Sequence, residues 1–177
     1  MKRRTLLSAL AAAAGASASP NPLRAATDHP ATAVPAVQVG QAVPWPNIAL
    51  LGGGRFGPEQ AAGHVVVVVF WTTTCPFCRR HNQHVEKLHR AALAAPAKRL
   101  RVLGVARETD RDAVARYAQA QGYSFPITLN QAGLAQLLSP RRVVPMTVVV
   151  DRQGRLKQAL AGEMFEEDLL ELLALAA

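Results

Sequence analysis

The chain has 177 residues, half of them hydrophobic, which suits one domain with a sizeable core and is short for two. Its formal net charge is +8, but four of its 20 basic residues lie in the first 24 positions, where no acidic residue accompanies them. The remaining 16 basic and 12 acidic residues leave a net charge of +4, with no basic cluster and no recognisable nucleic-acid-binding motif. The sequence therefore argues against nucleic-acid binding.

Residues 1–26 have the layout of an export signal. A basic start precedes an apolar stretch from Leu6 to about Ala18, which is short for a bilayer span of about 20 residues. Cleavage fits after Ala18 or near residues 25–26, and the arginine pair near the start fits a twin-arginine address or an ordinary basic start. We expect a soluble, exported, periplasmic mature chain with no integral membrane segment.

Residues 27–44 are rich in Pro, Ala and Val with little periodicity, which is typical of a tether. The domain is expected to span residues 45–177. It opens with two short strands, at residues 47–51 and 55–56, joined by three glycines. This pattern predicts a small N-terminal β-hairpin.

A central strand is predicted at residues 65–71, because this run contains only Val, Phe and Trp and is short for a helix. Such strands are buried on both faces of a sheet. Residues 76–95 follow with a helical pattern that places Val85, Leu88 and Ala92 on one face. Between strand and helix lies the first of the two cysteines.

Strands and helices alternate over the rest of the chain. Strands are expected at 100–106, 127–129, 146–150 and 156–160, and helices at 110–121, 132–138 and 165–173. Alternation that ends in a hairpin predicts an α/β domain with a central mixed β-sheet flanked by helices.

The only two cysteines, Cys75 and Cys78, are too few for a disulfide framework, and in an exported protein this spacing indicates redox chemistry. Cys75 stands at a helix start, where unpaired N–H groups and the helix dipole stabilise a thiolate. Pro76 suits the first helical position. Cys78 lies one turn further, within reach of a mixed disulfide on Cys75. We therefore expect Cys75 to be the nucleophile and Cys78 the resolving thiol.

Residues 70–78 read Phe-Trp-Thr-Thr-Thr-Cys-Pro-Phe-Cys and resemble the active-site segment of the thioredoxin-like superfamily, with TlpA/ResA-like exported thiol-disulfide oxidoreductases as the most similar branch. Residues 122–127 resemble the segment before that branch's third strand, residues 144–151 its cis-proline segment, and Gly154 its final hairpin turn. The resemblance implies a thioredoxin fold from Trp45 onward. It also implies exchange with cysteine-containing protein substrates and a thiol-disulfide electron-transfer partner, without a cofactor.

The resemblance further implies a substrate-binding role for two residues, and Trp71 is a third candidate from its place beside the cysteines. Pro145 would be cis and opposite the cysteines, with the Val144 backbone pairing with an extended substrate chain. Taken alone, the motif at Pro145 favours a trans proline at a strand edge. Trp71 fits either a pocket wall beside the cysteines or the core.

Two positions depart from the family pattern. The buried acid that precedes the Phe-Trp pair in thioredoxins is Val69 here, and the glutamate that follows the second cysteine by three residues in many ResA-like proteins is His81. His81 shares a helical face with Val85 and Leu88, so it is the candidate proton acceptor. The other interpretation is a partly exposed histidine with no role.

Other functions remain open. The preferred direction is that of a reductase, while Pro76 between the cysteines fits a disulfide-forming oxidase. Cys75, Cys78, His81 and His84 progress around one helix, so a four-ligand metal centre is excluded, although a smaller copper or zinc site is not. We expect no metal. Residues 72–75 also resemble a peroxiredoxin motif that lacks its proline, and a buried, inert disulfide is the remaining alternative.

Overall fold

The structure is a computed structural model that describes residues 36–129, 131–139 and 141–176. The expected signal peptide and the first part of the expected tether lie outside these residues. The elements run in the order β1 (Ile48–Ala49), β2 (Arg55–Phe56), α1 (Pro58–Ala61), β3 (Val65–Trp71), α2 (Pro76–Ala94), η1 (Pro96–Lys98), β4 (Leu100–Ala106), α3 (Arg111–Gln121), β5 (Ile127–Thr128), α4 (Gln131–Leu138), β6 (Met146–Val150), β7 (Leu156–Ala161) and α5 (Glu166–Leu175). None of the helices in this described part is long and apolar enough to cross a bilayer.

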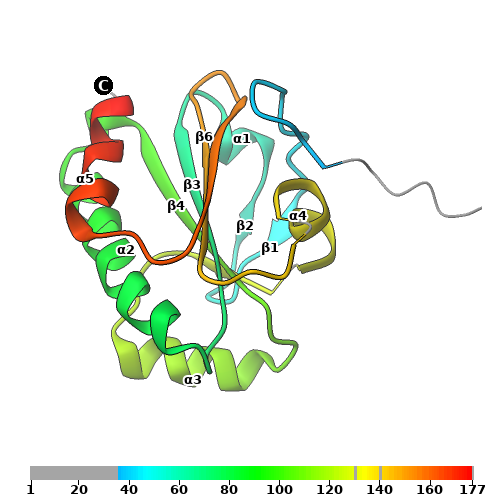
Figure 1. Cartoon of the computed structure of the whole chain (residues 1–177), viewed down its shortest axis with the longest axis vertical. Helices are drawn as coiled ribbons and strands as arrows, with labels where there is room; N and C mark the ends of the chain where they lie inside the picture. The colour runs from blue at the N-terminus through cyan, green and yellow to red at the C-terminus, as the bar shows by residue number, and fades with distance from the viewer. Residues whose placement is uncertain (1–35, 130, 140, 177) are drawn as a thin grey trace, which may run out of the picture. The chain divides into compact units, whose positions relative to one another are not determined.

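The centre of the domain is a five-stranded sheet in the order β5-β4-β3-β6-β7 (Figure 1). Strand β3 is parallel to β4 and antiparallel to β6, and all seven of its residues are buried. This confirms the predicted mixed sheet. The separate two-stranded sheet β1-β2 confirms the predicted N-terminal hairpin.

Side chains of β3 alternate between two hydrophobic cores, because successive residues of a strand point to opposite faces. Val67, Val69 and Trp71 pack in a core with residues of α2 and α5. Val68 and Phe70 pack in the other core, with residues of α4 and the β1-β2 hairpin. The unbroken apolar run was therefore a correct indication of a central strand covered on both faces.

Part of the segment that we assigned to the tether packs on the domain. The Val37 N–H donates to the Leu137 carbonyl and the Val43 N–H to the Gly154 carbonyl, both at 2.9 Å. Val43 is also buried in a core. The packed domain thus extends further toward the N-terminus than the expected boundary at residue 45, because these residues are held by backbone hydrogen bonds that leave no periodic pattern in the sequence.

Three chain segments meet at one end of the sheet. Strands β3 and β4 are parallel and in register from Val65↔Leu100 to Trp71↔Ala106, so the segments that follow them leave from the same edge. Strand β6 pairs Met146 with Phe70, which brings the segment before β6 to that edge as well. In Figure 1, α2 starts beside α3 at this end and rises along one face of the sheet toward α5.

Candidate active site

Cys75 occupies the N-cap of α2. Its backbone is extended, its Sγ accepts the N–H of Cys78 at 3.3 Å, and Pro76 follows at the first helical position. A sulfur in this place accepts a backbone N–H and lies at the positive end of the helix dipole, which are the surroundings of nucleophilic cysteines. Cys75 is partly exposed and both cysteines are free thiols. The expected cap geometry is therefore confirmed.

Cys78 lies in the first turn of α2 and is fully buried. Burial raises the pKa of its thiol to about 12, and a hydrogen bond to the Cys75 side chain and the nearby charge of Glu108 act in the same direction. One thiol is thus accessible and the other shielded. This arrangement permits an outside sulfur to react with Cys75 but not directly with Cys78.

Glu108 is a site residue that the sequence interpretation missed. It follows β4 by two residues, and its Oε1 accepts the backbone N–H of Thr73 in the loop that leads to Cys75. The sequence did contain a signal for Glu108, because the carboxyl ends of adjacent parallel strands meet at one edge of a sheet. An acid placed just after the strand next to β3 could have been assigned to the cysteines on that ground.

The segment before β6 forms another wall of the site. The Val144–Pro145 peptide bond is cis, as the resemblance implied. Pro145 is buried and its carbonyl accepts the N–H of Gly162 at 2.9 Å, whereas Val144 is half-buried. The preceding Val143 is 40 % exposed.

Trp71 does not line an open pocket. Its side chain is fully buried and packs against the rings of Tyr117 and Tyr123, with both centroids 5.9 Å away. Strand β4 makes room for it with Gly104, where an added Cβ would lie 3.1 Å from the indole Nε1 and 2.7 Å from the Phe125 ring. The interpretation of Trp71 as a pocket wall is therefore corrected. The indole belongs to the core, because the neighbouring aromatic rings cover it.

His81 is fully buried, so the interpretation as a partly exposed histidine is wrong. Its Nδ1 accepts the Met164 N–H at 3.1 Å, so its Nε2 carries the proton and donates to Thr147 Oγ1 at 3.0 Å. Burial lowers its pKa to about 4. Both nitrogens are engaged and the cation is disfavoured, so the geometry gives no support to His81 as proton acceptor for the thiols.

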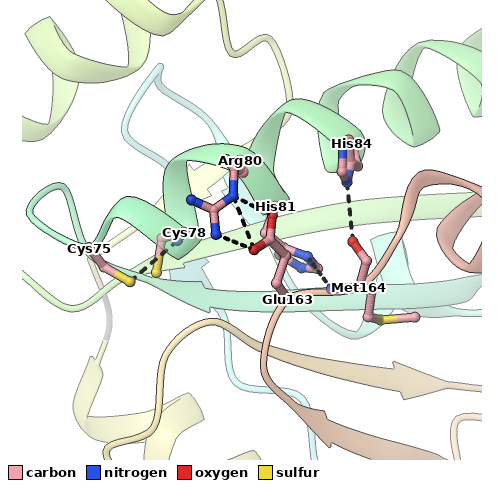
Figure 2. A network of polar contacts seen from close by, with 7 residues as sticks. All are labelled: Cys75, Cys78, Arg80, His81, His84, Glu163 and Met164. Atoms are coloured by element: carbon pink, nitrogen blue, oxygen red, sulfur yellow. Dashed lines mark hydrogen bonds and ion pairs between the residues drawn. The ribbon is translucent and has the colours of Figure 1, made fainter.

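The loop between β7 and α5 is held against α2 by three side chains (Figure 2). The Met164 backbone bonds to two histidines of α2. Its carbonyl accepts from His84 Nδ1 at 3.1 Å, and its N–H donates to His81 Nδ1. The Arg80 guanidinium forms a two-pronged ion pair with Glu163, 2.7 Å at its shortest. These contacts could not be predicted from the sequence, because their partners lie about 80 residues apart.

Within the residues that the structure describes, no three His, Cys, Asp or Glu side chains are grouped so that they could hold a metal ion. Of the four residues considered for such a site, His81 uses both ring nitrogens within the fold.

Comparison with known proteins agrees with this geometry. Residues 39–159 match the family described as AhpC/TSA. The chain belongs to the AhpC/TSA family. The thioredoxin-like protein YneN of Bacillus subtilis is 26% identical over 142 residues, which cover 78% of this chain and 81% of the relative. The thiol-disulfide oxidoreductase ResA of Geobacillus kaustophilus is 27% identical over 136 residues, 76% of this chain and 75% of the relative.

The fold also resembles that of a solved thiol-disulfide oxidoreductase structure. The crystal structure of StoA from Bacillus subtilis superposes with a TM-score of 0.61 at 20% identity and covers 74% of this chain and 98% of that protein. The sheet, the hairpin and the helices are those of the thioredoxin fold. This member of the AhpC/TSA family is a thiol-disulfide oxidoreductase of the thioredoxin-like class.

Proposed function

We propose that this protein is an exported thiol-disulfide reductase that exchanges its Cys75-Cys78 pair with cysteine-containing protein substrates in the periplasm. The observation that supports it most is the contrast between the two sulfurs. Cys75 is partly exposed at the start of α2, and Cys78 is buried one turn behind it with a raised thiol pKa. The basic and apolar leader supports export.

The proposed reaction has two steps. The Cys75 thiolate attacks one sulfur of a substrate disulfide, so that a mixed disulfide forms and the other substrate sulfur leaves as a thiolate. Cys78 then loses its proton and attacks the Cys75 sulfur, which releases the second substrate thiolate. Two electrons pass from the dithiol to the substrate, and a separate thiol-disulfide partner must return them.

The substrate is proposed to approach over Val144 and Pro145. Their segment lies at the edge of the sheet from which the Cys75 loop leaves. Val144 is half-buried and Pro145 uses its carbonyl within the fold, which supports Val144 as the residue that offers its backbone to an extended chain.

Glu108 is proposed to accept the proton that Cys78 loses in the second step. Its charge acts on the Cys78 thiol and its carboxylate is fixed by the Thr73 N–H. The pKa of Cys78, at about 12, means that the thiol needs such an acceptor at neutral pH. His81 has no free nitrogen for it.

The reductase direction is the one that the resemblance to ResA-like proteins implies. A dithiol pair becomes strongly oxidising when the fold stabilises its reduced form as a thiolate. Burial and the charge of Glu108 disfavour that thiolate at Cys78, so the potential depends on how strongly the fold stabilises a thiolate at Cys75. The oxidase alternative depends on Pro76 between the two cysteines.

The test is the reduction potential of the purified domain, equilibrated against glutathione and dithiothreitol buffers with Cys75→Ala as the control. We expect about −250 mV or lower, the range of reducing thioredoxins. A potential near about −120 mV would assign the protein to the oxidants instead. Absence of any exchangeable disulfide would remove the proposal altogether.

A further inference from the structure

The surface around Cys75 carries several arginines. Arg79 and Arg80 leave the first turn of α2 and are exposed, and Arg141 and Arg142 are exposed just before Val143. Arg79 and Arg80 follow Cys75 on α2, and Arg141 and Arg142 come just before the cis-proline segment, which lies at the sheet edge from which the Cys75 loop leaves. Figure 2 shows Arg80 beside the two cysteines. We call these four residues the arginine rim.

Among the described residues, three members of the rim have no ion-pair partner. Arg80 is paired with Glu163. Within the described part of the chain, the ion pairs found are Arg80 with Glu163, Lys87 with Glu166, and Arg90 with Glu86. Arg79, Arg141 and Arg142 therefore present their charges to solvent.

The cis-proline side of the rim is held in place by a fifth arginine. Arg107, at the end of β4, donates to Ser139 Oγ at 2.8 Å and to the Arg141 carbonyl at 3.2 Å. Burial lowers the pKa of Arg107, and the nearby charge of Arg142 lowers it further. Like charges are thus kept close together at the substrate end of the molecule, an unfavourable arrangement that a partner's carboxylates would relieve.

Acidic residues gather elsewhere. Glu166, Glu167 and Asp168 form the first turn of α5 and Glu171 follows one turn later. This helix packs on α2 beyond its reactive start. Four acids of α5 thus lie away from the rim, whereas Glu163 and Glu108 are the acids that the structure places near the thiols.

Resting on the proposed function, we infer that the arginine rim selects substrates whose reactive cysteine is flanked by aspartate or glutamate residues. Arg79 would meet carboxylates on one side of the substrate sulfur, and Arg141 and Arg142 those on the other. Opposite charges at an interface raise the association rate and fix orientation more than they raise affinity.

The test uses three short peptides with one cysteine each, activated as its mixed disulfide with 2-thiopyridine and flanked by acidic, neutral amide or lysine residues. Attack by Cys75 on the peptide sulfur releases thiopyridone, whose absorbance is followed, and Cys78 then releases the peptide thiol. The same peptides are treated with dithiothreitol, because flanking charges alter the intrinsic reactivity of a cysteine. Dividing by that rate leaves the contribution of the protein.

We expect the corrected rate for the acidic peptide to exceed that for the neutral one by at least about fivefold at low salt, and to approach it near 0.5 M salt. The double variant Arg141→Gln with Arg142→Gln should reduce this ratio by more than half. Arg152→Gln removes an equally exposed charge from the turn at the other end of β6 and should preserve it.

Equal corrected rates for acidic and neutral peptides, or an equal loss of preference in Arg152→Gln, would overturn the inference. Failure of the proposed function looks different, because no peptide would then release thiopyridone faster with the parent chain than with Cys75→Ala.

Discussion

The start of α2 and its next turns differ in how far their residues are exposed to solvent. At the start, Cys75 is partly exposed and Phe77 is 55 % exposed. In the following turns, His81, Asn82 and Glu86 are all buried, and His81 and Glu86 bond to other segments of the chain. The comparison indicates that the reactive turn can face solvent because the turns behind it are fixed to the body of the domain.

The largest expected effect would sharpen that comparison at the reactive turn. Cys75→Ser should lower the rate of thiol-disulfide exchange by at least about 1,000-fold, because a hydroxyl at this position is not ionised and is a poor nucleophile. The free energy of unfolding, measured with urea, should change by less than about 1 kcal/mol, because the serine can still cap the helix. Cys78→Ser should instead accumulate a mixed disulfide, visible by mass spectrometry.

Glu86→Ala should have the opposite profile. The buried Glu86 carboxylate accepts the Ser124 N–H at 2.7 Å, the Ser124 hydroxyl at 2.6 Å and the buried Phe125 N–H at 3.3 Å, so its loss removes three hydrogen bonds and leaves the Phe125 N–H without this partner. We expect a loss of about 3 kcal/mol in urea unfolding, with little change in exchange per folded molecule. Glu171→Ala, on the exposed side of α5, should cost less than about 0.5 kcal/mol.

Equal losses of unfolding free energy in Glu86→Ala and Glu171→Ala would contradict the idea that Glu86 fixes the later turns of α2 to the domain. A large drop in the exchange rate of the folded Glu86→Ala protein would break the comparison from the other side, because it would make this carboxylate part of the chemistry.

The pH dependence of stability tests the buried histidine. Because the folded-state pKa of His81 is about 4 and that of an unfolded histidine about 6.5, the unfolded chain binds the proton first as the pH falls. The contribution is fully present above about pH 6.5 and is lost as the pH falls toward 4. We expect His81 to account for about 2 kcal/mol of lost stability between pH 7 and pH 5. His81→Gln should lack this part of the slope, and parallel profiles would refute the assignment.

The smallest effect concerns the ion pair beside the reactive turn. Glu163→Gln frees the Arg80 charge to act on the Cys75 thiolate, so alkylation of Cys75 by iodoacetamide at pH 7 should accelerate by up to about twofold. Arg80→Gln should slow it. Glu166→Gln breaks the similar pair with Lys87 further along α2 and should leave the rate unchanged. The same acceleration in Glu166→Gln would show that only overall charge matters.

The sequence predicted the sheet and the cysteine cap well, because both depend on short-range patterns. Seven consecutive apolar residues left β3 few alternatives, and the strand-to-helix junction fixed the place of Cys75 and Pro76. The burial of His81 could not be predicted, because it depends on Thr147 and Met164, which are 66 and 83 residues away. The spacing of residues along a helix predicts which face of the helix a side chain is on. It does not predict how deeply that side chain is buried in the domain.

The lead-in to the domain determines where the protein can be attached to a surface. Residues 37–43 bond to the turn between β6 and β7 and to α4, and that turn lies at the opposite end of β6 from Pro145 (Figure 1). An immobilising tag joined through this segment would meet the domain at α4 and at the turn between β6 and β7, not at the start of α2. Coated on a sensor chip in this way, the protein would be held through elements other than the one that carries Cys75, which suits the screening of peptides in solution.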